Sequence, residues 1–504
     1  MLHTRRVSST MSHPKRISSQ SWKELGISTR PLAPAYRRRF QQRPLYFLLG
    51  IALVLYLLYT QRSSNRISSE DGRSRTWVQY EAALGLGSSQ KTLPCRSLPG
   101  AEDVLVVLKT GSTELEDKLP VHLTTTLRCY PNYMIFSDYE EDFRGEHIYD
   151  ALEFVDPKIQ ETHEDFELWR RLRNAGGRSA LLPSERSGPV STPPGATGKK
   201  SNPGWKLDKW KFLPMMNRTL YEHPDKKWYI FVETDTYIMW QTALNYLAAL
   251  DHKQPIYMGG QVWIGEILFA HGGTGFAVSA PALRQVVERF QNHQKEYEAF
   301  THWHWAGDCV LGKAMKEAGA PLMGVWPIWQ ADGIGDMHYR RDEGGLRLWC
   351  MPSVSYHHLT PVQVESMWTW EQEWMAKTKD PRAIVHHRDV YNQYVLPRIT
   401  APKQNWNNHA DEDQGPVNSL DECRAICTAL PACVQYALSL DLRCMTTARA
   451  NLGEWSRGID SGWIHDRMVD FHDNATLCKK ERNWITRGVA KQQFVHEIAP
   501  QVLH

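Results

Sequence analysis

The main body of the chain lacks an excess of positive charge, although the whole sequence of 504 residues carries a formal net charge of +3. Residues 1–44 hold ten lysines and arginines against the single Glu24, which leaves 49 basic and 55 acidic side chains for the rest. A body with this balance has no electrostatic footprint for nucleic acid, so we expect no such partner. No internal repeat is visible, and the 42% hydrophobic residues argue against wholesale disorder.

Long apolar runs are scarce, and the run PLYFLLGIALVLYLLYTQ (44–61) is the exception. It begins too deep in the chain for a cleaved secretory signal and lacks a small-residue cleavage pattern after it. Its eighteen uncharged residues just reach the length that crosses a bilayer, and arginines crowd the flank before it. We therefore expect a basic cytosolic tail (1–43), a retained type II anchor and a lumenal remainder, with a buried core helix as the rival interpretation. A short span suits the thin membranes of the early secretory pathway, which favours the Golgi membrane.

Nine cysteines agree with a lumenal compartment in which disulfides form. The odd count predicts at least one thiol that is free or paired with another chain. Two N-x-T triplets, at Asn217 and Asn474, are candidate N-glycosylation sites, although such triplets also occur by chance.

Strand and helix patterns alternate after a stem (62–94) that is rich in serine, glycine and arginine. Apolar runs predict strands at 104–110, 133–139 and 228–238, and helical spacing predicts helices in STELEDKLPVHLTTTLRCY, despite its proline, and in WKLDKWKFLPMMNRTLYEH. This alternation is typical of an α/β fold with a parallel sheet. Residues 175–204, rich in glycine, serine and proline, are predicted to be a surface insertion. A Trp-rich helical segment follows at 366–395, and we place a domain boundary near residue 400.

The third strand, WYIFVETDTYI, ends in two carboxylates, Glu233 and Asp235. Ligands of open α/β sheets bind beyond the carboxyl ends of the strands. Residues two apart in an extended chain point to the same side, and two neighbouring carboxylates repel unless a cation or water lies between them. Hard oxygen ligands favour Mg²⁺ or Mn²⁺. The pattern fits a divalent-cation site, and a solvated turn is the alternative.

Four stretches in order resemble the inverting β1,3-glycosyltransferases that include Fringe and the core 1 β1,3-galactosyltransferase. They are WYIFVETDTY (D-D-D-T-Y in the family), GGTGFAVSAPAL (G-G-A-G-Y-x-L-S), AGDCVLGKAMKEAG (E-D-V-x-L-G) and VSYHHLTP (V-S-F-H). The resemblance covers roughly residues 100–395. It implies a Rossmann-like nucleotide-sugar glycosyltransferase domain of the GT-A type over 95–400.

The resemblance also implies a set of site residues. Asp235 and His357 match the family's metal ligands for Mn²⁺ or Mg²⁺, and the adjacent His358 could substitute because sequence does not fix the register. Glu233 matches the family's first acidic residue, on the nucleotide side. Thr234 departs from the family's middle Asp, and Glu233 is longer than the family's Asp, which puts metal affinity and donor choice in question.

Asp308 matches the family's catalytic base, which takes the proton of the acceptor hydroxyl. Its other interpretation is the N-cap of the helix that follows, and the two are compatible. Gly272 and Gly273 suit either a close approach of a sugar or phosphate to the backbone or a tight turn.

Twenty tryptophans are many for this length, and Trp303, Trp305 and Trp329 are candidate acceptor contacts. Aromatic faces can pack against the C–H faces of sugars, although tryptophans more often belong to a core. His302 and His304 are interpreted as structural, because no third metal ligand is in view.

The block DECRAICTALPACVQYALSLDLRCMT resembles a PAN/apple module, a short helix stapled to a small sheet, here placed at 415–480 with a tail at 481–504. By analogy Cys423 pairs with Cys444 and Cys427 with Cys433, while Cys478 has no obvious mate. A zinc site is the rival and is disfavoured in an oxidising lumen without suitable histidine spacing. In the preceding domain, plausible pairs are Cys95 with Cys129 and Cys309 with Cys350.

Two functions follow as hypotheses. The first is a Golgi enzyme, anchored in the membrane, that moves a hexose, galactose in a β1,3 linkage by the resemblance, from a UDP-sugar to a glycan or glycoprotein with inversion. The second is a lumenal carbohydrate-binding or protein-binding protein on a decayed transferase fold.

Overall fold

The computed structural model describes residues 93–187, 202–339, 341–343, 346–469 and 478, all in one compact unit that begins at Thr92. The expected cytosolic tail, the anchor, nearly all of the stem, the centre of the 175–204 insertion, Asn474 and the 481–504 tail lie outside these residues. Among the helices in these ranges, none is both long and apolar enough to span a bilayer.

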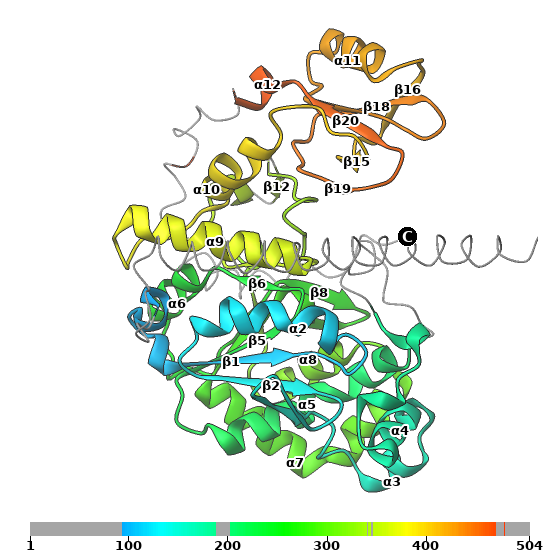
Figure 1. The fold of residues 1–504 in the computed structure, drawn as a ribbon. Coiled ribbons are helices and arrows are strands. Elements are labelled where there is room, and N and C mark those ends of the chain that lie inside the picture. Colours follow the sequence, from blue (N-terminus) through cyan, green and yellow to red (C-terminus); the bar gives the residue numbers. More distant parts are fainter. Residues whose placement is uncertain (1–92, 188–201, 340, 344–345, 470–477, 479–504) are drawn as a thin grey trace, which may run out of the picture. The chain divides into compact units, whose positions relative to one another are not determined.

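An eight-stranded sheet forms the centre of the N-terminal part, in the order β11-β7-β10-β5-β1-β2-β4-β3 (Figure 1). The strands are β1 (Val104–Lys109), β2 (Tyr133–Ser137), β3 (Glu141–Phe143), β4 (Glu146–Asp150), β5 (Trp228–Glu233), β7 (Tyr257–Gly259), β10 (Phe276–Ser279) and β11 (Leu322–Gly324). β1 runs parallel to β2 and β5, whereas β10 runs antiparallel to both of its neighbours. The three strands predicted from sequence are confirmed as neighbours in a mostly parallel sheet; the antiparallel members were not foreseen.

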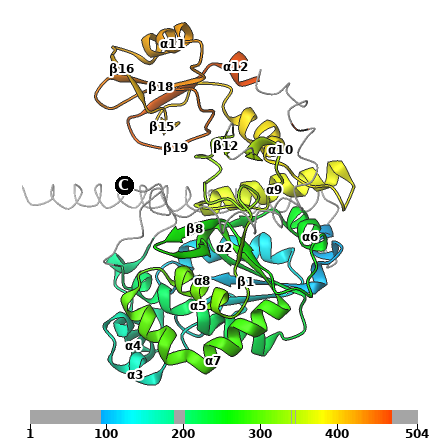
Figure 2. The same cartoon turned by 180° about the vertical axis from the view of Figure 1, so that it is seen from behind.

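Helices cover both faces of this sheet (Figures 1 and 2). The longer helices are α2 (Leu115–Thr124), α4 (Glu167–Ala175), α5 (Pro203–Glu222), α6 (Trp240–Ala248), α7 (Ala280–Trp303), α8 (Gly307–Glu317) and α9 (Pro361–Thr378). α2 contains Pro120, as the sequence predicted. α5, α7 and α8 pack on one another, and the six residues of β1 are all buried, as expected for a strand covered on both faces. The main core lies between this helical layer and the sheet.

Shorter elements surround the sheet. They are α3 (Pro157–Thr162), β6 (Tyr237–Ile238), β8 (Gln261–Ile264), β9 (Ile267–Ala270), β12 (Asp342–Glu343), β13 (Leu346–Arg347), β14 (Ser355–Tyr356) and α10 (His387–Val390). β6 pairs with β14 in an antiparallel ladder, and β8 pairs with β9 in a hairpin. Asn217 lies inside α5, where its side-chain oxygen accepts a hydrogen bond from Gln291, and not in the surface loop typical of a glycosylation site.

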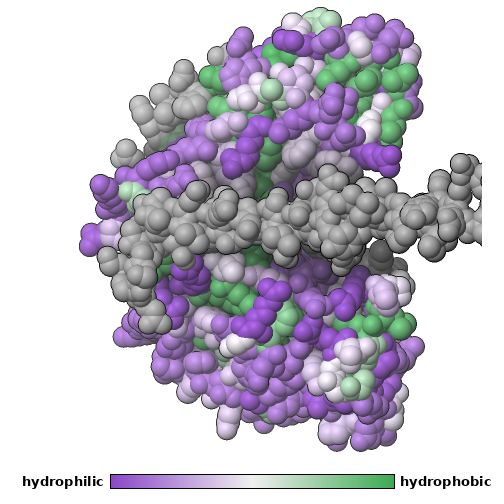
Figure 3. Space-filling view, viewed as in Figure 1, coloured by the Kyte–Doolittle hydropathy of each residue, from purple (hydrophilic) through white to green (hydrophobic). Residues whose placement is uncertain are grey.

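The C-terminal part forms a second, four-stranded sheet in the order β16-β18-β17-β20. Its elements are β15 (Trp406–Asn407), β16 (Glu412–Pro416), α11 (Leu420–Ala429), β17 (Gln435–Leu438), β18 (Arg443–Thr447), β19 (Glu454–Trp455), β20 (Asp460–Trp463) and α12 (His465–Val469). The Ser419 side chain caps α11 by accepting a hydrogen bond from the Glu422 amide. The face seen in Figure 3 is largely hydrophilic, with apolar patches scattered over both the N-terminal and the C-terminal part.

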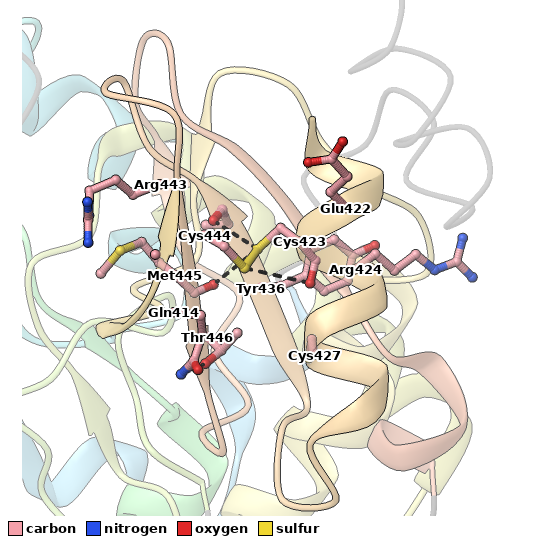
Figure 4. The surroundings of a disulfide bond; sticks show 12 residues. Gln414, Glu422, Cys423, Arg424, Cys427, Tyr436, Arg443, Cys444, Met445 and Thr446 are labelled. Atoms are coloured by element: carbon pink, nitrogen blue, oxygen red, sulfur yellow. Dashed lines mark hydrogen bonds between the residues drawn. A yellow bond between two sulfur atoms is a disulfide. The ribbon is translucent and has the colours of Figure 1, made fainter. Parts of the chain in front are cut away.

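Three of the four predicted disulfides are confirmed. Cys95 bonds Cys129, Cys427 bonds Cys433, and Cys423 bonds Cys444, which staples α11 to β18 (Figure 4). The predicted pairing of Cys309 with Cys350 is wrong. Cys350 instead bonds Cys478, which was left without a mate, while Cys309 is the free, buried cysteine in the described part of the chain. Cys309 packs in a small apolar cluster with Phe269 and Ala306. Its thiol is therefore part of the buried face of α8.

Candidate metal centre

A two-residue ladder brings two distant segments of the chain together. Tyr237 in β6 pairs with Tyr356 in β14, and the Leu359 amide donates to the Asp235 carbonyl at 2.9 Å. Only Thr236 separates Asp235 from the start of β6, and His357 directly follows β14. Because the strands run antiparallel, the residues beyond this end of the ladder face one another across it.

Asp235, His357 and His358 form the candidate site. Each offers one ligand atom, and the three atoms lie within 4.8 Å of one another. The Asp235 Oδ1 atom lies 3.4 Å from the His357 Nε2 atom. The His358 backbone adopts a left-handed conformation with φ of 58°, and its ring lies 3.8 Å from the His357 ring, centroid to centroid. A non-glycine residue in this region carries strain that is common at functional sites.

The imidazoles of the site have unused nitrogens. The Nδ1 atoms of His357 and His358 are buried and have no hydrogen-bond partner among the described residues. Burial and the neighbouring His357 lower the pKa of His358 to about 4, so His358 is neutral near pH 7. Burial alone would lower the pKa of His357, but the Asp235 carboxylate outweighs it and raises that pKa. A neutral imidazole is the form that binds metals.

The predicted convergence of Asp235 and His357 is confirmed in geometry, and His358 adds a third ligand atom instead of replacing His357. One carboxylate and two imidazoles suit a first-row divalent cation better than Mg²⁺, which takes oxygen ligands. The donor set therefore fits a cation.

The extended arrangement assumed for Glu233 and Asp235 is wrong. The chain turns after Glu233, with the Thr236 amide bonded to the Glu233 carbonyl, so the two carboxylates take different partners. Glu233 Oε1 lies 3.0 Å from the Nζ atom of buried Lys109, whereas Asp235 Oδ2 lies 3.5 Å from the Nζ atom of Lys118. Two lysines thus relieve the repulsion between the carboxylates, which was expected to require a cation or water.

Both lysines were missed in the sequence. Lys109 ends β1 at the same sheet edge as Glu233, and it also pairs with Asp208 at 2.6 Å. Lys118 lies in α2 and pairs with Glu114 at 2.9 Å. The signal for Lys109 was available, because a lysine that ends an apolar strand reaches the same edge as the carboxylates.

Thr234 holds the turn between the two acids. Its carbonyl lies 2.8 Å from the His122 Nε2 atom, and its hydroxyl donates to Glu114 at 3.4 Å. The His122 ring is fixed in turn by Thr126, 2.8 Å from its Nδ1 atom. Thr234 therefore points to α2 and orients the segment that carries Asp235.

Gly272 and Gly273 belong to a short 3₁₀ turn (Gly272–Thr274) before β10. Of the two interpretations offered by the sequence, the structure therefore shows the tight turn. Because β10 is antiparallel to β5, this turn lies at the carboxyl end of β5. A Cβ atom on Gly273 would overlap the His357 ring, and the Gly273 carbonyl accepts a hydrogen bond from Thr236 at 2.7 Å. Glycine is required at position 273 because the backbone comes close to the His357 imidazole, and not because it must approach a sugar or phosphate.

Substituting Gly273 by alanine is expected to weaken cation binding by about 10- to 100-fold, because the His357 ring must move away from Asp235. Mn²⁺ titration followed by electron paramagnetic resonance measures the change. Gly265→Ala is the control for backbone strain alone: its φ of 57° disfavours alanine, but a Cβ there meets no neighbour within 4 Å and is expected to leave cation binding unchanged. Equal affinities for wild type and Gly273→Ala would show that His357 is not a ligand.

Asp308 lies beside the same turn. Its Oδ2 atom accepts a hydrogen bond from the Gly272 amide at 2.9 Å, and its Oδ1 atom accepts one from the Cys309 amide at 2.9 Å. The N-cap of α8 is Ala306, so the N-cap interpretation of Asp308 is wrong. Burial raises the pKa of Asp308, although the nearby His271 charge and the Gly272 amide oppose this effect. A raised pKa makes a carboxylate a stronger base.

His271 lies near both His357 and Asp308, and it was not foreseen from the sequence. It directly precedes Gly272, its ring lies 5.4 Å from that of His357, and its buried Nδ1 atom has no hydrogen-bond partner among the described residues. Burial lowers the pKa of His271. The signal in the sequence was its place next to the glycine pair.

Two of the three candidate acceptor tryptophans are available. Trp303 is 86% exposed and Trp305 is 54% exposed, and both precede Asp308 by a few residues. The expectation for Trp329 is wrong, because that side chain is fully buried, packs against Gly275 and belongs to the core. His302 Nδ1 lies 2.5 Å from His163 Nε2, so its ring is engaged with another imidazole, outside the metal-ligand group.

No protein-family model matches the sequence. Fold and site define a mixed α/β protein with several disulfides and a candidate cation site at the edge of its central sheet.

Proposed function

We propose that this chain is a metal-dependent inverting glycosyltransferase with a catalytic domain of the GT-A type. It moves a hexose, expected to be galactose in a β1,3 linkage, from a UDP-sugar to a glycan or glycoprotein acceptor. The observation that carries the proposal is the convergence of Asp235, His357 and His358 at the sheet edge where α/β folds bind nucleotides, with Asp308 of α8 hydrogen-bonded to the neighbouring glycine turn.

The cation site has a defined role in this reaction. A bound divalent cation, Mn²⁺ more readily than Mg²⁺ with this donor set, supplies positive charge that neutralises the departing diphosphate. Asp235, His357 and His358 would hold the ion. Lys109 holds Glu233 in place at 3.0 Å, so the Glu233 carboxylate stays on the nucleotide side of the turn and apart from the three ligands.

Asp308 serves as the general base. The acceptor hydroxyl gives its proton to the Asp308 carboxylate as its oxygen bonds the anomeric carbon from the face opposite the diphosphate. The bond between the anomeric carbon and the diphosphate oxygen breaks, and its electron pair leaves with UDP. The amides of Gly272 and Cys309 fix the carboxylate, and the exposed rings of Trp303 and Trp305 lie close by in sequence to receive the acceptor sugar.

The remaining parts of the chain fit a Golgi type II enzyme. Residues 44–61 would anchor it, with the catalytic domain lumenal, and four disulfides agree with an oxidising compartment. The C-terminal unit, with α11 stapled to its sheet, is proposed to be a PAN/apple-like module that captures the acceptor.

Full-length protein in detergent should transfer a hexose from one member of a UDP-sugar panel to a glycan acceptor when Mn²⁺ is present. Product release is followed by mass spectrometry, and nuclear magnetic resonance establishes the anomeric configuration. Retention of configuration would contradict the single-base mechanism. Failure with every donor, combined with glycan binding, would support the alternative of a lumenal binding protein on a decayed transferase fold.

A further inference from the structure

A buried carboxylate lies behind the ladder that carries the metal ligands. Glu371 in α9 is 1% exposed. Its Oε2 atom accepts a hydrogen bond of 2.5 Å from the Tyr237 hydroxyl, and its Oε1 atom accepts one of 3.4 Å from the Gln241 amide at the start of α6. Tyr237 is itself fully buried and is the ladder partner of Tyr356. Glu371 therefore bonds the ladder through Tyr237, and none of its hydrogen bonds in the described part of the chain goes to the three candidate ligands.

The surroundings of Glu371 offer donors but no compensating cation. The titratable groups that face it are Tyr237 from β6 and Tyr130, which follows the 3₁₀ turn Thr126–Arg128, and the start of α6 adds backbone amides of Trp240 and Gln241. Within the described ranges no lysine or arginine lies at ion-pair distance from Glu371. Burial raises the pKa of Glu371 to about 7. The hydrogen bonds from Tyr237 and from the two amides lower this pKa, but burial outweighs them.

The two charge states of Glu371 bond their neighbours differently. The ionised carboxylate accepts from the Tyr237 hydroxyl and from the amides at the start of α6, where the helix N-terminus favours negative charge. In the protonated acid one oxygen carries a hydrogen atom, so that oxygen is a weaker acceptor for these donors. The hydrogen bonds to the ionised carboxylate are charge-assisted and therefore stronger than those to the neutral acid. The hydrogen bond between Tyr237 and Glu371 is therefore strongest when Glu371 is charged.

We propose that Glu371 is a positioning residue: its charged form clamps Tyr237, fixes the β6–β14 ladder and so sets the spacing of Asp235 and His357 for the cation. This inference rests on the proposed metal site. It gives the site a pH dependence near neutrality that is separate from the protonation of the ligands themselves. A compartment that acidifies below pH 7 would loosen the site.

The test compares Mn²⁺ affinity of full-length wild type and Glu371→Gln at pH 6 and pH 8, measured by electron paramagnetic resonance. Glutamine mimics the protonated acid, and changes in protonation of His357 and His358 affect both proteins alike. The ratio of the two dissociation constants is expected to be near one at pH 6 and to rise to about tenfold at pH 8. Tyr237→Phe should remove the pH dependence of this ratio, because it removes the hydroxyl through which Glu371 acts.

Glu298→Gln is the matched control. Glu298 is another buried carboxyl with a raised pKa, but it lies in α7 and bonds the Asp156 amide and Gln294. Thermal unfolding at both pH values verifies that each variant is folded. A ratio for Glu371→Gln that is the same at pH 6 and pH 8 would overturn the positioning role. Absence of Mn²⁺ binding by wild type at both pH values would instead reject the metal site, and the inference with it.

Discussion

Replacing Asp308 by asparagine is expected to lower kcat of hexose transfer by roughly 10²- to 10⁴-fold while leaving UDP affinity nearly unchanged. The Asp308 carboxylate lies beside the glycine turn, where it accepts hydrogen bonds from the Gly272 and Cys309 amides, and it is not among the three metal-ligand atoms. Asparagine has nearly the same shape and can still accept a hydrogen bond from one of these amides, but it does not take a proton. Transfer kinetics and UDP calorimetry on the same preparation measure the two effects separately.

The pH profile adds a second readout for Asp308. Burial raises the pKa of this carboxyl, and a base works only when it is deprotonated, so kcat of the wild type should rise with pH through a limb above the usual range of aspartate. The limb should disappear in Asp308→Asn. Asp225→Asn, an exposed acid that precedes β5 at the end opposite to the site, is the control and should keep full activity. Equal kcat for wild type and Asp308→Asn would refute the base.

Replacing Asp235 by alanine is expected to weaken Mn²⁺ binding by more than about 100-fold. Asp235 is the only carboxylate of the three-residue ligand group in the described part of the chain, and losing a ligand costs more than losing an outer partner. The change also removes one of the carboxylates that neutralise Lys118, and the uncompensated ammonium repels a cation further. Titration with Mn²⁺ at constant pH gives the affinity directly.

Glu233→Gln is the sharpest control for Asp235, because the two acids are separated by one residue. Glu233 pairs with Lys109, which keeps Asp208 as a second partner, so this variant should retain cation binding within a few-fold. If both variants lose Mn²⁺ equally, the two carboxylates share the ion and the ligand assignment fails.

Patterns that depend on one segment of the chain could be predicted from sequence. The apolar runs of β1, β2 and β5 are continuous because both faces of these strands are buried, and helical spacing identified α2 and α5. The cysteines of α11 are one helical turn apart, and the resemblance to a small stapled module was enough to pair them. The short hairpin of β3 and β4 has little apolar content and was missed.

Features that depend on two distant segments could not be derived in this way. The turn at Thr234 is held by His122, 112 residues earlier in the chain, and it separates the two carboxylates that an extended strand would have placed together. Cys350 pairs with Cys478 across 128 residues, which no local spacing reveals. His358 joins the site through a left-handed backbone that sequence does not specify for histidine. The order of the motifs along the chain identified Asp235 and His357 as candidates. The pairing of β6 with β14 explains why the two residues lie close together.

Calorimetry of UDP binding to the full-length protein, with Mn²⁺ and then with a chelator, is the decisive test of the proposed nucleotide-sugar site. We expect saturable binding with Mn²⁺, loss of binding with the chelator, and no Mn²⁺-dependent binding by Asp235→Ala. Binding of the same strength with and without the metal, or none under either condition, would contradict the assignment of a nucleotide-sugar site to this edge of the sheet.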